Sequence, residues 1–204
     1  LSGCSCLTSI VIPKNVTSIG DNAFSGCSSL TSIVIPDGVT SIGWHTFSDC
    51  SSLSSIAIPA SVTSIGKGAF EKCENLTYIE LPFVGSTPNG TVNTHFGYIF
   101  GADSNTDNAT YVPKSLTKVS FRGTAKDFTI DENAFYGLTG VTVVQEFRVE
   151  YNYGDGFGNR IQYVGKGSFA TKPTDATKDG YRLVGWFHGD REWNFDTDTV
   201  TEDV

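Results

Sequence analysis

Residues 30–36 read LTSIVIP, and this stretch decides the fold because it recurs at a fixed spacing. The same seven letters stand at 7–13, and related forms follow at 53–59 (LSSIAIP) and 76–82 (LTYIELP), each step being 23 residues. The residues between the copies keep the same step: Val16, Val39 and Val62; Ile19, Ile42 and Ile65; Phe24, Phe47 and Phe70; Cys4, Cys27, Cys50 and Cys73. Such a period indicates a repeat architecture.

Each repeat has the pattern of a short coil of chain. The L-x-x-I-x-I segment predicts a strand with Leu and Ile on one face, which Pro ends because it cannot donate to a ladder. The V-T-S-I segment predicts a second extended piece. Residues 21–24 (DNAF) predict one helical turn, capped by Asp21 or a neighbouring residue. One coil cannot cover its own apolar face, so we expect coils stacked at ~4.8 Å to share one interior.

The pattern L-x-x-I-x-I-P…V-T-S-I-G-x-x-A-F-x-x-C-x-x-L resembles the BspA-like leucine-rich repeats of bacterial surface proteins. The resemblance implies a mainly β, right-handed solenoid with short helical turns. It further implies secretion or display on the cell surface, and binding of host or matrix partners.

The period breaks once before it resumes. Leu116 follows Leu76 by 40 residues, so one coil is 17 residues longer than the repeat. We place this long variant coil at 83–113, with a turn at 88–90 (PNG). Residues 130–135 (IDENAF) then match residues 19–24, and the solenoid is expected to cover residues 1–144.

The long coil carries an aromatic cluster at residues 95–101 (HFGYIFG). In one interpretation Phe96, Ile99 and Phe100 fill the interior where the repeat is interrupted, as buried aromatics usually do. In the other, Phe96 and Tyr98 form a platform for a sugar or a peptide. The similar long coils of BspA-like proteins favour the structural interpretation.

From residue 145 onward the composition changes. Residues 147–151 and 160–164 alternate as two antiparallel strands around a turn at 154–156. The order P-T-x-x-T-K-x-G-Y-x-L-V-G-W-F, then x-W-N-F-D, resembles the Listeria–Bacteroides repeat, also called the internalin B-repeat. This implies a small β-grasp-like module at 145–204. That family usually closes with one more strand, which we expect to be absent here or supplied differently.

Composition excludes several classes of partner. Net charge is −8 with no basic stripe, which argues against nucleic acid and against an anionic membrane surface. No apolar stretch approaches the ~18 residues of a membrane span, so no insertion within this chain is expected. The chain begins within a repeat, and we expect any export signal or anchor to lie outside it.

No arrangement of catalytic or metal-binding residues is visible, so we expect neither an enzyme nor a cofactor. The cysteines of the repeat would stack in a column that does not converge on a metal, and we expect buried free thiols rather than disulfides. Cys6 lies off the column and is expected to be exposed. His45, His95 and His188 share no metal-site spacing, and Asp103, Asn105 and Asp107 fit a solvated turn better than a calcium site.

A binding surface therefore remains as the candidate site, formed by outward residues of the strands and by the long coil. The candidate residues are Ser32, Val34, Ser55, Ala57, Tyr78, Glu80, Phe96, Tyr98, Lys118 and Ser120. We place the main contact near Tyr78 and Glu80, because tyrosine supplies contact area with a polar tip. The predicted function is adhesin-type recognition of a protein or glycan at the bacterial surface; the alternatives are a passive spacer or an accessory region of a secreted enzyme.

Overall fold

The computed structural model describes residues 1–122, 130–151, 160–165, 168–173, 187–188 and 191–200. The chain divides into two compact units. The first comprises Leu1–Phe121 and the described residues up to Val144, and the second begins again at Gln145. The predicted turn at 154–156 and most of the Gly-Tyr…Gly-Trp segment at 180–187 lie outside the described residues.

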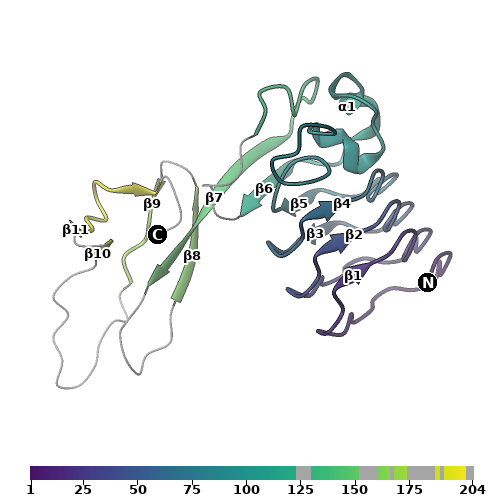
Figure 1. The fold of residues 1–204 in the computed structure, drawn as a ribbon, viewed down its shortest axis with the longest axis horizontal. Coiled ribbons are helices and arrows are strands. Elements are labelled where there is room, and N and C mark those ends of the chain that lie inside the picture. Colours follow the sequence, from purple (N-terminus) through teal and green to yellow (C-terminus); the bar gives the residue numbers. More distant parts are fainter. Residues whose placement is uncertain (123–129, 152–159, 166–167, 174–186, 189–190, 201–204) are drawn as a thin grey trace. The chain divides into compact units, whose positions relative to one another are not determined.

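The first unit is a stack of coils whose short strands run parallel (Figure 1). One sheet has the order β1-β2-β4, with Ser18, Ser41 and Ser64 in register. A second ladder pairs β3 with β5 and β5 with β6. Its bounds and those of the first sheet are β1 Ser18–Ile19, β2 Ser41–Ile42, β3 Ser55–Ala57, β4 Ser64–Ile65, β5 Tyr78–Leu81 and β6 Lys118–Arg122. The mainly β solenoid expected from the repeat is confirmed.

The turn of each coil is held by the coil that follows it. The N–H groups of Phe24 and Phe47 donate to the carbonyls of Thr46 and Ala69 at 2.8 Å. The residues predicted to form one helical turn are consecutive tight turns, because Asn22 has a φ of 56°. Asp21 does not cap this segment; its Oδ1 accepts the N–H of Trp44 from the next coil at 2.7 Å.

The interior of the first unit is a set of ladders, and the phenylalanine ladder is the largest. Phe24 stacks on Phe47 with ring centroids 5.5 Å apart, and Phe47 on Phe70 at 5.4 Å. Phe47 and Phe70 are fully buried, as are Leu30, Leu53 and Leu76 of the leucine ladder. Burial of identical side chains in every coil is therefore the main stabilising term of the solenoid.

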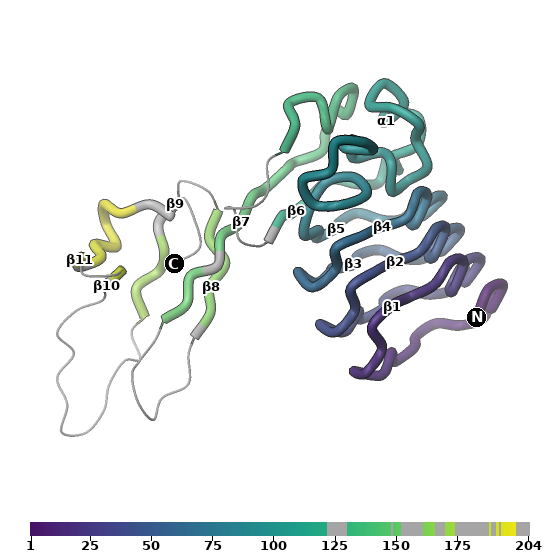
Figure 2. Tube along the Cα trace, viewed as in Figure 1, coloured from purple at the N-terminus to yellow at the C-terminus, as the bar shows by residue number. Residues whose placement is uncertain are grey.

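The long coil connects β5 to β6 (Figure 2). It continues the interior with residues other than those of the repeat. It contains a 3-10 helix, η1, at Phe96–Phe100, a second, η2, at Asn105–Asp107, and the helix α1 at Asn108–Tyr111. The ring centroids of Phe100 and Phe70 are 6.3 Å apart, and those of Phe96 and Phe100 are 5.3 Å apart. Phe96, Ile99 and Phe100 are all buried, so the structural interpretation of the aromatic cluster is confirmed.

A buried amide fixes the long coil to the last coil of the solenoid. Asn108, fully buried, accepts the N–H of Gly97 at 2.8 Å. Its Nδ2 donates to the carbonyls of Ala134 and Tyr136 at 3.0 and 3.2 Å. All three hydrogen bonds of the amide go to backbone groups, and the Gly97 N–H among them is buried.

The second unit has its own small core. β7 Thr142–Tyr151 pairs antiparallel with β8 Arg160–Gly165, which confirms the predicted pair of strands. Phe147, Val149 and Val164 are buried there, and Trp193 packs against them. The remaining strands are β9 Ser168–Phe169, β10 Phe187–His188, β11 Arg191–Glu192 and β12 Thr199–Val200, paired as β9 with β12 and β10 with β11. The β-grasp-like arrangement of this unit stays a prediction.

Candidate functional site

The outward side chains of the strands form a continuous row, here called the strand face. It comprises Val11, Ser32, Val34, Ser55, Ala57, Tyr78, Glu80 and Lys118. Val11 bridges Val34 in the parallel direction, and both are strongly exposed, at 89% and 80%. Ser32, Ser55 and Ala57 are exposed as well. The pleat of the strands explains this, since Ile33 and Ile56 between them point into the core.

Three of the predicted residues come together at one end of the strand face. Tyr78 lies directly beside Lys118 across β5 and β6. The Tyr78 hydroxyl donates to Glu80 Oε2 at 3.0 Å, and Lys118 Nζ lies 5.6 Å from the centre of the tyrosine ring. A cation over an aromatic face is favourable, so the three side chains hold one another in place. We call Tyr78, Glu80 and Lys118 the Tyr78 cluster.

Two of the predicted site residues are placed wrongly by the sequence argument. Ser120 is fully buried, although it alternates with the core residues Val119 and Phe121. Alternation specifies which way a side chain points, and it does not specify what packs on that side. Phe96 is also fully buried and stacks on Phe135 at 4.7 Å, so it is core and not a contact residue.

Tyr98 is half-buried and lies away from the strand face. Its carbonyl accepts the N–H of Gly68, and the neighbouring Ile99 carbonyl accepts that of Phe70. These are bonds to the turns of the coil, which we call the turn side (residues 21–27, 44–50 and 67–73). The predicted contact residues Tyr78 and Tyr98 therefore lie on different sides of the solenoid.

The turn side carries the chemical variety that the strand face lacks in its first coils. Trp44, 62% exposed, stands one repeat after Asp21 and one before Lys67. His45 Nδ1 lies 3.0 Å from Glu71 Oε2. The sequence could have pointed to this surface, because the residue type at the same repeat position changes from one coil to the next, as at Asp21, Trp44 and Lys67.

Lys67 pairs with Asp103 of the long coil. The hydrogen bond raises the pKa of the Lys67 ammonium and lowers the pKa of the Asp103 carboxyl. The Asp103 carboxylate is thus paired with the ammonium group of Lys67. Within the described ranges, no group of three or more His, Cys, Asp or Glu is placed to hold a metal ion.

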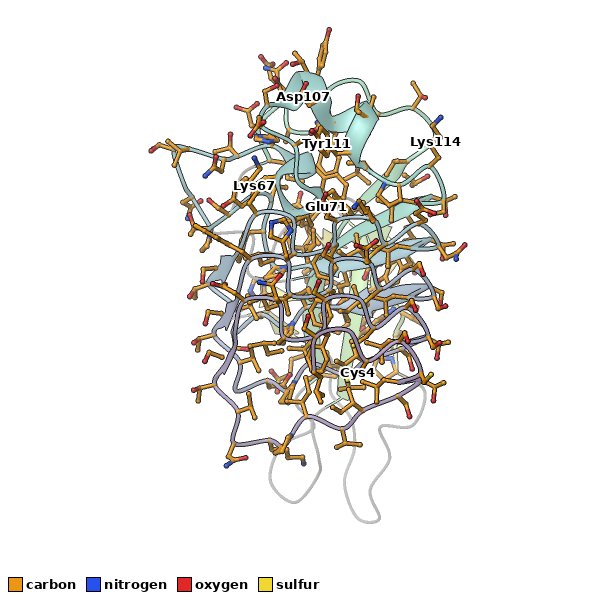
Figure 3. The ribbon with its side chains drawn as sticks, turned by 90° about the vertical axis from the view of Figure 1, so that its right-hand side faces the viewer. Cys4, Lys67, Glu71, Asp107, Tyr111 and Lys114 are labelled. Carbon is orange, nitrogen blue, oxygen red and sulfur yellow. The ribbon has the colours of Figure 1, made fainter. Side chains whose placement is uncertain are left out.

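A cleft of about 440 Å³ opens where the long coil crosses the turn side. Its charged and hydroxyl-bearing lining includes Glu71, Lys72, Glu74, Tyr111 and Lys114. Figure 3 shows Glu71 and Tyr111 close together, with Lys67 and Lys114 on either side. None of these residues was among the predicted contacts, because the prediction considered the strand face and Tyr111 and Lys114 lie in a segment without repeat register.

The repeat cysteines form the expected column of free thiols. Cys27, Cys50 and Cys73 are buried, Cys4 is half-buried and Cys6 is exposed. The Cys50 thiol donates to the carbonyl of Phe24 and the Cys73 thiol to that of Phe47, each at 3.2 Å and each in the preceding coil. Burial raises the pKa of the Cys50 thiol to about 12 and also raises that of Cys73. These thiols are protonated at neutral pH and poorly nucleophilic.

Comparison with known families agrees with this geometry. Residues 1–91 match the BspA type leucine rich repeat region, with six copies, and residues 147–204 match the Listeria-Bacteroides repeat domain. The chain carries BspA-type leucine-rich repeats followed by a Listeria–Bacteroides repeat. Leucine-rich repeat proteins of this type are typically non-catalytic, and the family indicates a role in recognition at a surface. In the described part of the chain, no helix has the length and apolar character to cross a membrane.

Several solved structures are similar to this BspA-type chain. A leucine rich repeat protein of T. pallidum is 30% identical over 59% of this chain and 48% of its own, with a TM-score of 0.44. A leucine-rich repeat protein from Eubacterium ventriosum is 25% identical over 67% and 32%, with a TM-score of 0.45. A leucine rich cell surface protein from Faecalibacterium prausnitzii is 26% identical over 71% and 41%, with a TM-score of 0.38.

The chain spans about half the length of the T. pallidum protein and less of the other two. No curated protein matches the chain at a significant level.

Proposed function

We propose that the chain is an extracellular recognition module of adhesin type, which binds a protein partner through its strand face. The observation that carries this proposal is the Tyr78 cluster at the end of an exposed apolar row. Tyr78, Glu80 and Lys118 are held together by contacts with one another across two strands. Tyrosine is enriched in protein interfaces, because it supplies contact area with a polar tip at a low cost in conformational entropy.

The shape and chemistry of the row favour a protein as the partner. Val11, Val34 and Ala57 follow one another on successive coils and are exposed. An extended row of this kind matches the surface that solenoids use to bind other proteins. Val11 and Val34 are strongly exposed, so packing of the interior does not explain why valine stands at these two positions.

A passive spacer remains the second candidate, and one observation favours it. The outward residues of the first three coils are small and uncharged, with only serine, valine and alanine at these positions. Such a surface offers no strong polar contact. On this hypothesis the Tyr78 cluster would stabilise the pairing of β5 with β6 and nothing more.

The experiment that tests the proposal measures binding of the purified chain to immobilised extracellular-matrix and host-cell surface proteins. Tyr78→Ala is compared with wild type on each protein that binds. We expect Tyr78→Ala to weaken a true interaction by about 10-fold or more, as loss of a central aromatic does. Val34→Glu, on the exposed apolar row, is expected to weaken the same interaction.

Tyr111→Ala is the matched control, because Tyr111 is a surface tyrosine of the same unit outside the strand face. Thermal unfolding of each variant verifies that the fold is retained. No binding to any protein of the panel, or binding that neither Tyr78→Ala nor Val34→Glu alters, would leave the spacer hypothesis as the better account.

A further inference from the structure

The cleft on the turn side has the construction of a second ligand site. It lies between the turn at residues 71–74 and the segment that follows α1. Its volume of about 440 Å³ is in the range of small-molecule sites. Phe100 and Val112 line it from the interior, where both are buried. The floor is therefore apolar and rigid, and the polar groups stand at its rim.

Two residues of the lining, Tyr111 and Glu71, also lie against Gly101, the residue that follows Phe100. Gly101 has a φ of 105°, and a Cβ built there would lie 3.4 Å from Tyr111 Cδ1 and 3.7 Å from Glu71 Cδ. The ring and the carboxylate thus flank a backbone that carries no side chain. Glu71 is oriented by His45 at 3.0 Å, and Tyr111 is 41% exposed.

The charges around the cleft balance. The lining contains two carboxylates, Glu71 and Glu74, and two ammonium groups, Lys72 and Lys114, together with the hydroxyls of Thr110 and Ser115. Lys72 Nζ also lies 3.9 Å from Asp49 Oδ2, outside the lining. A phosphorylated or otherwise strongly anionic ligand would meet two carboxylates, and a polycation would meet two ammonium groups. A neutral ligand rich in hydroxyls satisfies both signs, since each hydroxyl donates to a carboxylate and accepts from an ammonium.

A peptide is a poorer match to this cleft. Extended peptides are held by adding a strand to a free sheet edge, and helical peptides need a long apolar groove. The lining residues here belong to turns, to η1, and to α1 and the segment after it, and none of them lies on a β-strand. Main-chain pairing with a peptide therefore has no strand edge available among these residues.

We propose that this cleft binds a neutral oligosaccharide, with one sugar ring lying on Tyr111. The face of tyrosine is an apolar surface with a polar tip, which matches the apolar face and the hydroxyl rim of a sugar ring. Glu71 and Glu74 accept from the hydroxyls on one side, and Lys72 and Lys114 donate on the other. The site is separate from the strand face, and the proposal does not depend on protein binding there.

The test is binding of the whole chain to an array of uncharged oligosaccharides, followed by titration calorimetry with those that bind. Tyr111→Ala is expected to weaken binding by about 10-fold or more, while Tyr111→Phe keeps the ring and most of the affinity. Tyr136→Ala is the matched control, because Tyr136 is 57% exposed and does not line the cleft. Retained thermal unfolding shows that each variant is folded.

Three results would overturn the proposal: no uncharged oligosaccharide binds the folded chain, binding is unchanged in Tyr111→Ala, or anionic glycans or peptides compete at this cleft more strongly than neutral sugars. The outcome is independent of the strand face. Tyr78→Ala should leave sugar binding intact, and Tyr111→Ala should leave protein binding intact.

Discussion

The regular coils and the long coil build the same interior by different means. In the regular coils, one phenylalanine per repeat stacks on its equivalents, as Phe24, Phe47 and Phe70 do. In the long coil, Phe96 and Phe100 reach the same ladder from a 3-10 helix. Repetition supplies the partners in the first case, and a specific local structure supplies them in the second.

The two regions also differ in how they satisfy polar groups. The regular coils use threonines at the surface: Thr40 and Thr63 each donate to a threonine carbonyl of the preceding coil. The long coil uses one buried amide, Asn108, for three backbone groups. The regular coils thus distribute their polar contacts over many residues, whereas the long coil concentrates them on one. The long coil also forms part of the lining of the cleft.

The largest expected effect tests whether the two interiors are equivalent. Phe47→Ala and Phe96→Ala should each lower the free energy of unfolding by about 3–5 kcal/mol, because each leaves a cavity in a packed core. Urea denaturation of the two variants measures this. A cost below about 1 kcal/mol for Phe96→Ala would show that the long coil is not part of the core and would reopen its role as a platform.

A smaller effect is expected at the concentrated polar contact. Asn108→Ala should lower the free energy of unfolding by about 1–3 kcal/mol, because it removes three hydrogen bonds and leaves the buried Gly97 N–H without its acceptor. Asn75→Ala is the control from a regular coil, where the amide is exposed and donates to Ser51, and it should cost about 0.5 kcal/mol or less. Equal costs in urea denaturation would contradict the contrast between concentrated and distributed contacts.

The thiol column of the regular coils predicts an alkaline weakness. The pKa of Cys50 is about 12 in the fold against 9.0 ordinarily, so from pH 9 to 12 the unfolded chain binds fewer protons than the folded one. Stability therefore falls as the pH rises through this window. Cys50→Ala should flatten that fall relative to wild type. Urea midpoints at pH 8, 10 and 11 measure it, and parallel curves would argue against a buried thiol.

The smallest effect is expected at the contact that ties the long coil to a regular one. Lys67 and Asp103 are both at the surface, and their pair should contribute little because solvent screens it. The lowered pKa of Asp103 means that its contribution is present above the ordinary carboxyl pKa and is lost as the pH falls through the lowered value. Asp103→Asn should lower the melting midpoint slightly at low salt and not at 1 M NaCl.

The sequence predicts the interior well and the surface unevenly. Periodic apolar residues determine the stacking, so Phe47, Cys50 and Leu53 could be placed before any coordinates were known. Outward positions on the strands follow from alternation, which succeeded at Val34 and Ala57. It was wrong at Ser120, because a period of two says nothing about what covers a face.

The cleft could not be predicted because its residues come from segments without a shared period. Tyr111 and Glu71 are 40 residues apart, and only the path of the long coil brings them to the same glycine. Phe96 was correctly considered as core by one interpretation, since a run of aromatics within a solenoid needs an interior to fill. Only the exposed fraction of the Phe96 side chain, which the structure provides, decides between a core residue and a binding platform.

The hydrogen bonds that thiols and threonines make between coils have a consequence for how the gene can gain or lose repeats. Cys50 and Cys73 reach a carbonyl 26 residues earlier, and Thr40 and Thr63 reach one 23 residues earlier, so every coil makes the same connections to its predecessor. A gene segment copied in whole units of 23 codons encodes a coil whose partners already exist on both sides. The number of coils can thus change by duplication or loss without redesign of the interior.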